Sequence, residues 1–135
     1  MVKVIIGKKG TGKTKTLIGM VNQETMESAG NVVCIEYGDK LKLDISSKAR
    51  LIDIKSYNIS GIEALEGFIL GLFAGNYDIT SVYVDSILKI VGEDLVKLGE
   101  LLEKLDKFTA ASQTNVTVMV SADAADAPAS VAKFI

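Results

Sequence analysis

The sequence predicts a single-domain α/β fold with three layers, in which a mainly parallel five-stranded sheet lies between helices. Short apolar runs alternate with segments of helical periodicity along the whole chain, which is typical of a parallel sheet wrapped by helices. The 135 residues are enough to bury one hydrophobic core but not two. Residues 1–135 are therefore expected to form one domain.

Five short apolar runs are the expected strands. They are residues 2–6, 32–35, 50–54, 82–84 and 116–120. Most are rich in valine and isoleucine, as is usual for strands that are buried on both faces of a parallel sheet. The stretch 40–48 is polar and rich in lysine, so we expect a loop there with a short turn.

Three segments have the apolar spacing of helices. The first runs from Lys13 toward residue 28, and the second begins at 60–63, where Ser60 and Glu63 match a capping box. A third, long amphipathic helix follows the fourth strand, and a loop with a short terminal helix is expected for residues 122–135. The residues that predict inward-facing stripes are Leu17, Ile18, Val21, Ile62, Leu65, Ile69, Leu72, Leu95, Leu98, Leu102 and Leu105.

Three glycines recur at every fourth position of the second helical segment. They are Gly67, Gly71 and Gly75, and this spacing places them along one side of the helix. We expect them to allow close packing of the helix against the sheet. The alternative interpretation is a close-packed surface for a partner protein.

Composition excludes several classes of function. There is no histidine, which rules out histidine-based general bases, catalytic triads and histidine-ligated zinc sites. The net charge of −2 and a single arginine, Arg50, give no support for nucleic-acid binding. No apolar stretch approaches the 18 or so residues of a membrane span. With one cysteine, Cys34, and a strand that begins at once without a signal peptide, a cytoplasmic protein is expected.

The most informative segment follows the first expected strand. Residues 7–14 read Gly7-Lys8-Lys9-Gly10-Thr11-Gly12-Lys13-Thr14, a complete G-x-x-x-x-G-K-[ST] phosphate-binding loop, or Walker A motif. Glycines let the backbone turn its N–H groups inward, and the helix that follows favours an anion at its start. Lys13 is expected to reach the β- and γ-phosphates of a nucleotide, and Thr14 to hold a magnesium ion.

Polar side chains also end the other expected strands. Ligands bind beyond the carboxyl ends of strands in open parallel sheets, so Glu36 or Asp39, Asp85 and Ser121 are candidates for the same site. Residues 81–85 resemble the Walker B element, a buried strand that delivers one aspartate to the magnesium shell. The alternative for Asp85 is a cap on the next segment.

With both elements, the chain resembles the P-loop NTPase superfamily over most of its length, and RecA-like ATPases in particular. The resemblance implies that the strand after Walker B lies between the two motif strands and ends in a polar sensor residue, here Ser121. The fifth strand should therefore pair with the first. It also implies a catalytic glutamate at the end of the second strand, where Glu36 and Asp39 are the candidates. Ser86 stands where many ATPases of this branch carry a glutamate.

A second branch shares part of the motif. The loop resembles the deviant Walker A of MinD-like and ParA-like ATPases, whose signature lysine occupies the second position, here Lys8. Those proteins have glycine at the third position, where this chain has Lys9. In that family the signature lysine reaches the partner's nucleotide across a dimer. We favour the simpler interpretation, in which Lys8 is a solvated loop cation.

The expected function is the binding of Mg-ATP by a slow ATPase that acts as a nucleotide-dependent switch. Slow turnover is expected because Ser86 replaces a glutamate and the chain has no arginine finger. The alternative is a module that holds ATP, hardly hydrolyses it and acts through a partner protein. A protein partner or a second copy in a homodimer would supply the missing groups, as activating proteins do for GTPases.

Overall fold

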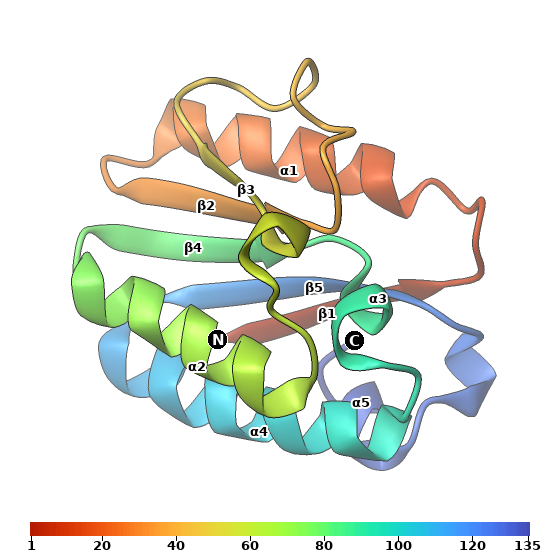
Figure 1. The fold of residues 1–135 in the computed structure, drawn as a ribbon. Helices are drawn as coiled ribbons and strands as arrows, with labels where there is room; N and C mark the ends of the chain where they lie inside the picture. Colours follow the sequence, from red (N-terminus) through yellow and green to blue (C-terminus); the bar gives the residue numbers. More distant parts are fainter.

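A computed structural model describes all 135 residues, from Met1 to Ile135. Its centre is a five-stranded sheet in which all neighbouring strands are parallel, in the order β1-β5-β4-β2-β3 (Figure 1). The strands are β1 (Val2–Gly7), β2 (Asn31–Glu36), β3 (Arg50–Asp53), β4 (Ile79–Val84) and β5 (Asn115–Ser121). The helices are α1 (Lys13–Glu27), α2 (Ile62–Gly75), α3 (Ile87–Val91), α4 (Leu95–Ser112) and α5 (Ala129–Ala132), with short 3-10 turns η1 (Ile54–Tyr57) and η2 (Ala124–Asp126).

The predicted α/β fold class is confirmed, and so is the place of the last strand. Strand β5 pairs with β1 from Val2–Val116 to Gly7–Ser121, and it pairs with β4 on its other side. The strand that leads into the glycine-rich loop and the strand that ends before Asp85 are thus separated by one strand. Their carboxyl ends lie roughly 10 Å apart, two strand spacings.

Helices cover both faces of the sheet (Figure 1). Helix α1 lies on one face, and α2 and α4 lie on the other. The larger core cluster has 22 buried residues and joins the sheet to α2, α3, α4 and α5, while a cluster of nine lies under α1. Cys34 belongs to the smaller cluster, where burial raises the pKa of its thiol to about 12. Cys34 is thus a small residue of the core.

The connection from β2 to β3 contains no helix, as predicted. Residues 37–49 form turns that fold back over the α1 side of the sheet, with Leu41 and Ile45 buried in the smaller core. Asn22 of α1 anchors this loop: its amide nitrogen donates to the carbonyl of Asp44 and its oxygen accepts from the backbone N–H of Ser46, both at 2.8 Å. Because this connection lies on the α1 side, it places no helix over β3 on the opposite face.

The prediction for the three glycines of α2 is wrong. A Cβ added at Gly67, Gly71 or Gly75 would meet nothing within 4 Å, and all three residues are exposed. They therefore do not pack closely against the sheet, and no internal contact requires the missing side chains. A glycine inside an exposed helix costs roughly 1 kcal/mol relative to alanine.

Helix α2 begins within the predicted residues 60–63, but its cap differs from the prediction. Gly61, with φ 95°, is the N-cap of α2, and no side chain caps this helix, so the predicted capping box at Ser60 is not formed. The long helix α4 is capped by Asp94, whose carboxylate accepts from the N–H groups of Val96 and Lys97. None of the helices combines the length and the apolar character that crossing a bilayer requires.

Candidate phosphate and metal site at the carboxyl edge of the sheet

The loop between β1 and α1 is compact because glycines stand where the backbone turns. Gly10 and Gly12 have φ angles of +87° and +85°, a region that favours glycine. A Cβ at Gly7 would lie 2.8 Å from Oγ1 of Thr11. Thr11 closes the turn, since its hydroxyl donates to the carbonyl of Lys8 at 2.7 Å and its backbone N–H donates to the same oxygen at 3.3 Å.

Free donors gather where this loop enters α1. The backbone N–H groups of residues 12–15 donate to no backbone carbonyl, as is usual for the first turn of a helix. The positive end of the helix dipole lies at the same point. Lys13 adds a full charge: its Nζ is 3.0 Å from the carbonyl oxygen of Lys8 and 3.4 Å from Oγ1 of Thr11. Together these groups can hold an anion.

A hydroxyl and a carboxylate meet beside the free donors. Oγ1 of Thr14 donates to Oδ1 of Asp85 at 3.3 Å, although the two residues are 71 positions apart. Asp85 follows β4 directly, and its own N–H donates to the carbonyl of Ile35 on β2, which fixes its position at the sheet edge. Burial raises the pKa of the Asp85 carboxyl above its usual range, while the Thr14 hydrogen bond and the nearby Lys89 ammonium oppose this rise.

These groups line a cavity of about 480 Å³ that contains no hydrophobic side chain. Four lysines and one carboxylate face it, so the local charge is strongly positive although the whole chain is acidic. An anion with several negative charges suits such a cavity better than a neutral ligand. The lining residues are Lys9, Gly10, Gly12, Lys13, Thr14, Lys15, Asp85, Ser86, Lys89 and Ser121.

Most of the residues singled out in the sequence come together here. Residues 9–14 with the exception of Thr11, together with Asp85 and Ser121, line the cavity, and Gly7, Lys8 and Thr11 form the turn behind it. Sequence reasoning missed Lys15 and Lys89. Lys89 belongs to α3, whereas Asp85 precedes this helix and the chain turns at Ser86 between them, so no helical spacing in the sequence relates the two residues.

The two candidate catalytic carboxylates of the β2 end do not line this cavity. Glu36 is buried, and its two oxygens accept from the N–H groups of Lys40 at 3.0 Å and Leu41 at 3.1 Å. Burial raises the pKa of Glu36; these two hydrogen bonds act against the rise, and the charges of Asp53 and Asp85 add to it. Asp39 is exposed and lines a separate cavity of about 250 Å³ under residues 37–49.

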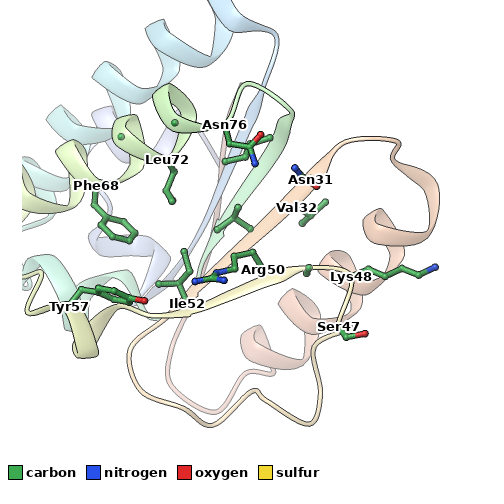
Figure 2. A pocket seen from close by; sticks show the side chains of 15 residues that line it. Asn31, Val32, Ser47, Lys48, Arg50, Ile52, Tyr57, Phe68, Leu72 and Asn76 are labelled. Carbon is green, nitrogen blue, oxygen red and sulfur yellow. The ribbon is translucent and has the colours of Figure 1, made fainter.

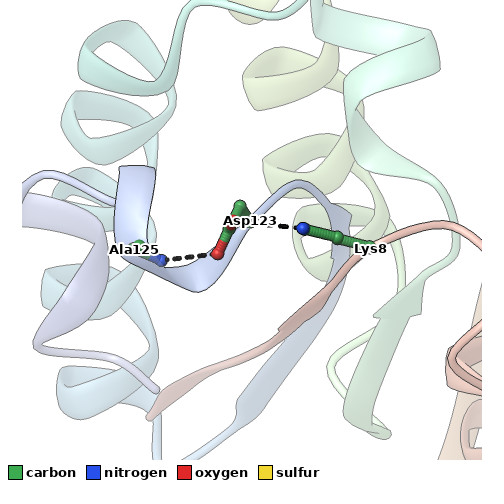
Figure 3. A network of polar contacts seen from close by, with 3 residues as sticks. All are labelled: Lys8, Asp123 and Ala125. Atoms are coloured by element: carbon green, nitrogen blue, oxygen red, sulfur yellow. Dashed lines mark hydrogen bonds and ion pairs between the residues drawn. The ribbon is translucent and has the colours of Figure 1, made fainter.

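Lys8, the residue that bears on the second family resemblance, forms an ion pair within the chain (Figure 3). Its Nζ lies 3.5 Å from Asp123, whose other contact is a hydrogen bond from the N–H of Ala125. Both partners are exposed, with 74% and 44% of their side-chain surfaces accessible. Exposed pairs of this kind contribute about 0–1 kcal/mol. Lys8 is therefore a solvated loop cation in this structure and does not line the polar cavity.

Comparison with protein-family models and with curated protein sequences finds no match for the chain. The resemblance to P-loop NTPases therefore stays a prediction, based on the motif at residues 7–14 and on Asp85. What the fold brings together is a polar cavity with free backbone donors, four lysines, and a hydroxyl beside a carboxylate. Such an arrangement can bind a phosphate group and a hard divalent cation side by side.

Proposed function

We propose that this protein is a P-loop nucleotide-binding domain that binds Mg-ATP and hydrolyses it slowly as a nucleotide-dependent switch. The observation that supports this most is the contact of Thr14 with Asp85 at 3.3 Å, next to a glycine-rich loop with free N–H groups. A simple anion site would need only the loop and its lysines. The hydroxyl and the carboxylate add the oxygen ligands that a magnesium–phosphate complex needs.

Each group has a role in this proposal. The N–H groups of residues 12–15 and the Lys13 ammonium bind the phosphate chain. Thr14 and Asp85 hold magnesium, which prefers oxygen ligands and usually takes one or two carboxylates with water and substrate phosphates. Ser121, at the end of β5 beside Gly7, is the polar sensor of the transferred phosphate. The bound magnesium would neutralise charge that develops on the phosphates.

The switch element is the loop at residues 37–49. Glu36 ends the strand next to β4 and holds this loop by the N–H groups of Lys40 and Leu41, while the charge of Asp85 acts on its carboxyl. A cation bound at Asp85 would lower the pKa of Glu36 and favour its ionised form. Occupancy of the site would in this way tighten the loop. A reducing cytoplasm is part of the proposal, because Cys34 is a free buried thiol.

One observation favours the alternative, an ATP-binding module that hardly hydrolyses its nucleotide and acts through a partner protein or a second copy. Asp85 is the only carboxylate that lines the polar cavity, and Glu36 is engaged with the loop. No second carboxylate is thus placed to orient an attacking water. Phosphate release measured with and without cell extract separates the two functions: release above the level of Lys13→Ala supports the ATPase, and no release in either condition supports the module.

Nucleotide should stabilise the fold. At about a hundred times its dissociation constant, a ligand adds roughly 2.7 kcal/mol to the free energy of unfolding. In a domain of this size, that raises Tm on the order of 10 °C. Thermal denaturation with Mg-ATP, Mg-GTP and magnesium alone measures the effect and reports the preferred base. If no nucleotide shifts Tm of the well-folded protein, the proposed function is wrong.

Lys8→Ala should change ATP binding and turnover little, because the side chain is exposed and pairs only with Asp123. Sedimentation of the wild-type protein with and without ATP should show no nucleotide-driven dimer. Asp123→Ala serves as the matched control, because it breaks the same ion pair from the other side. An ATP-dependent dimer that disappears in Lys8→Ala, but persists in Asp123→Ala, would instead support the deviant Walker A branch.

A further inference from the structure

A second cavity lies at the other end of the sheet (Figure 2). It has a volume of about 690 Å³, within the range of small-molecule sites, and eight of its 15 lining residues are hydrophobic. Its floor includes Val33, Ile52 and Ile79, all buried on the α2 side of the sheet, where the β2–β3 connection adds no helix over β3. Ile79 opens β4, so this cavity is near the amino ends of the strands, away from the phosphate loop.

The only arginine of the chain lies in this cavity without a partner. Arg50 shares the α2 face of β3 with Ile52, forms no ion pair, and begins the strand at the free edge of the sheet. Figure 2 shows its side chain running along the cavity toward Ile52 and Tyr57, whereas Lys48 points away. No aspartate or glutamate lines the cavity. The chain carries 17 acidic residues, yet none of them neutralises this guanidinium.

Helix α2 forms the wall of the cavity opposite β3, with two apolar side chains and two glycines. Phe68 and Leu72 of α2 face the cavity, and the ring of Phe68 lies 6.2 Å from that of Tyr57, centre to centre. Gly71 and Gly75 form the open side, since a Cβ at either position would meet nothing within 4 Å. Side chains there would occupy the cavity without any clash inside the protein. The two glycines therefore leave this part of the cavity open, at the expense of helix stability.

We propose that this cavity binds a small organic carboxylate with an aromatic or branched apolar body. The guanidinium of Arg50 pairs with the carboxylate through two parallel hydrogen bonds. The apolar body lies over Ile52 and against the contacting rings of Phe68 and Tyr57, beside the gap left by Gly71. A carboxylate fits better than a polyphosphate, because Arg50 is the one cation whose side chain runs along the cavity and it offers charge for one anionic group only. This site is independent of the proposed nucleotide function and shares no lining residue with the phosphate cavity.

The test compares charged and neutral probes by NMR titration of the ¹⁵N-labelled protein. The probes are 4-phenylbutanoate, indole-3-propanoate and 4-methylpentanoate, each with its primary amide. We expect at least one carboxylate to bind about tenfold more tightly than its amide, as a charge-assisted hydrogen-bond pair implies. The shifted amides should be those of β3 and the second half of α2. In Arg50→Gln, the carboxylate and its amide should bind alike.

A matched pair of variants on α2 tests the position of the ligand. Gly71→Leu fills the cavity and should abolish binding, whereas Gly67→Leu changes an equally exposed glycine that does not line it and should leave binding unchanged. Neither variant should unfold the protein, because both replace an exposed helical glycine. The proposal is wrong if no probe binds at millimolar concentration, if amides bind as well as carboxylates, or if shifts occur only at residues 9–15.

Discussion

Lys13→Ala should weaken ATP binding about ten- to a hundredfold, with or without magnesium. The reason is that Lys13 offers charge-assisted hydrogen bonds to phosphate, each worth roughly 1.5–3 kcal/mol. Calorimetric titration of ATP in magnesium and in EDTA measures the effect. Lys107→Ala, which removes an exposed lysine of α4 far from the loop, is the control and should bind as the wild type does. If Lys13→Ala and the wild type bind ATP with equal affinity, the glycine-rich loop is not part of the nucleotide site.

Asp85→Asn should impair ATP binding in a different way from Lys13→Ala, because we propose that this carboxylate acts through the magnesium ion. Its loss should chiefly remove the contribution of magnesium to ATP affinity and leave binding in EDTA nearly unchanged. Asp123→Asn removes a carboxylate that contacts the loop outside the cavity and should keep the magnesium effect. An undiminished magnesium effect in Asp85→Asn would show that the Walker B interpretation is wrong.

The same substitution should stabilise the protein when no ligand is present. Burial raises the folded-state pKa of Asp85 above its unfolded value, so the folded state binds a proton more readily than the unfolded state. The free energy of unfolding therefore falls as pH rises through that window, and at neutral pH the ionised carboxylate is destabilising. Asparagine keeps an acceptor for Thr14 without the charge, and thus we expect a higher Tm at neutral pH. If Asp85→Asn instead has a lower Tm than the wild type at neutral pH, the buried charge of Asp85 does not destabilise the folded protein.

Glu36→Ala should destabilise the protein strongly. The buried N–H of Leu41 loses its acceptor, which costs about 1–3 kcal/mol on its own, and the lost volume adds to this cost. Tm should fall on the order of 5–10 °C, and protease should cut first within residues 37–49. Asp39→Ala changes an exposed carboxylate three residues away and should leave both measurements unchanged. Loss of ATP turnover without loss of stability would instead indicate a catalytic role for Glu36.

The sequence predicted the parts of this protein that depend on local pattern. Strand and helix positions follow from apolar spacing, and the glycine loop follows from a motif whose backbone angles only glycine adopts easily. The place of β5 came from the family resemblance, and the ladder with β1 confirms it.

Other features depend on tertiary contacts that no pattern records. The sequence pattern of the three α2 glycines is the same whether or not they pack against the sheet. Only the rotation of α2 about its own axis decides whether they do. Glu36 could be placed at a strand end, but its partners are N–H groups of Lys40 and Leu41, which carry no side-chain signature. Lys89 enters the cavity because the chain turns at Ser86, where φ is +53°, before α3 begins.

The position of β5 also determines when the protein can fold. Strand β1 has no other strand partner. Val2 therefore cannot pair until Val116 has been synthesised, more than a hundred residues later. Parallel pairing over such a separation requires the closure of a long loop. Its entropic cost arises before any favourable contact offsets it, which makes folding slow. A ribosome-bound chain that ends before residue 115 contains β2, β3 and β4 but not β5, so β1 and the glycine loop that follows it have no strand beside them, and the unpaired edges of β1 and β4 are prone to aggregation. Strand β1 emerges long before β5 and is thus among the last elements to acquire its native structure.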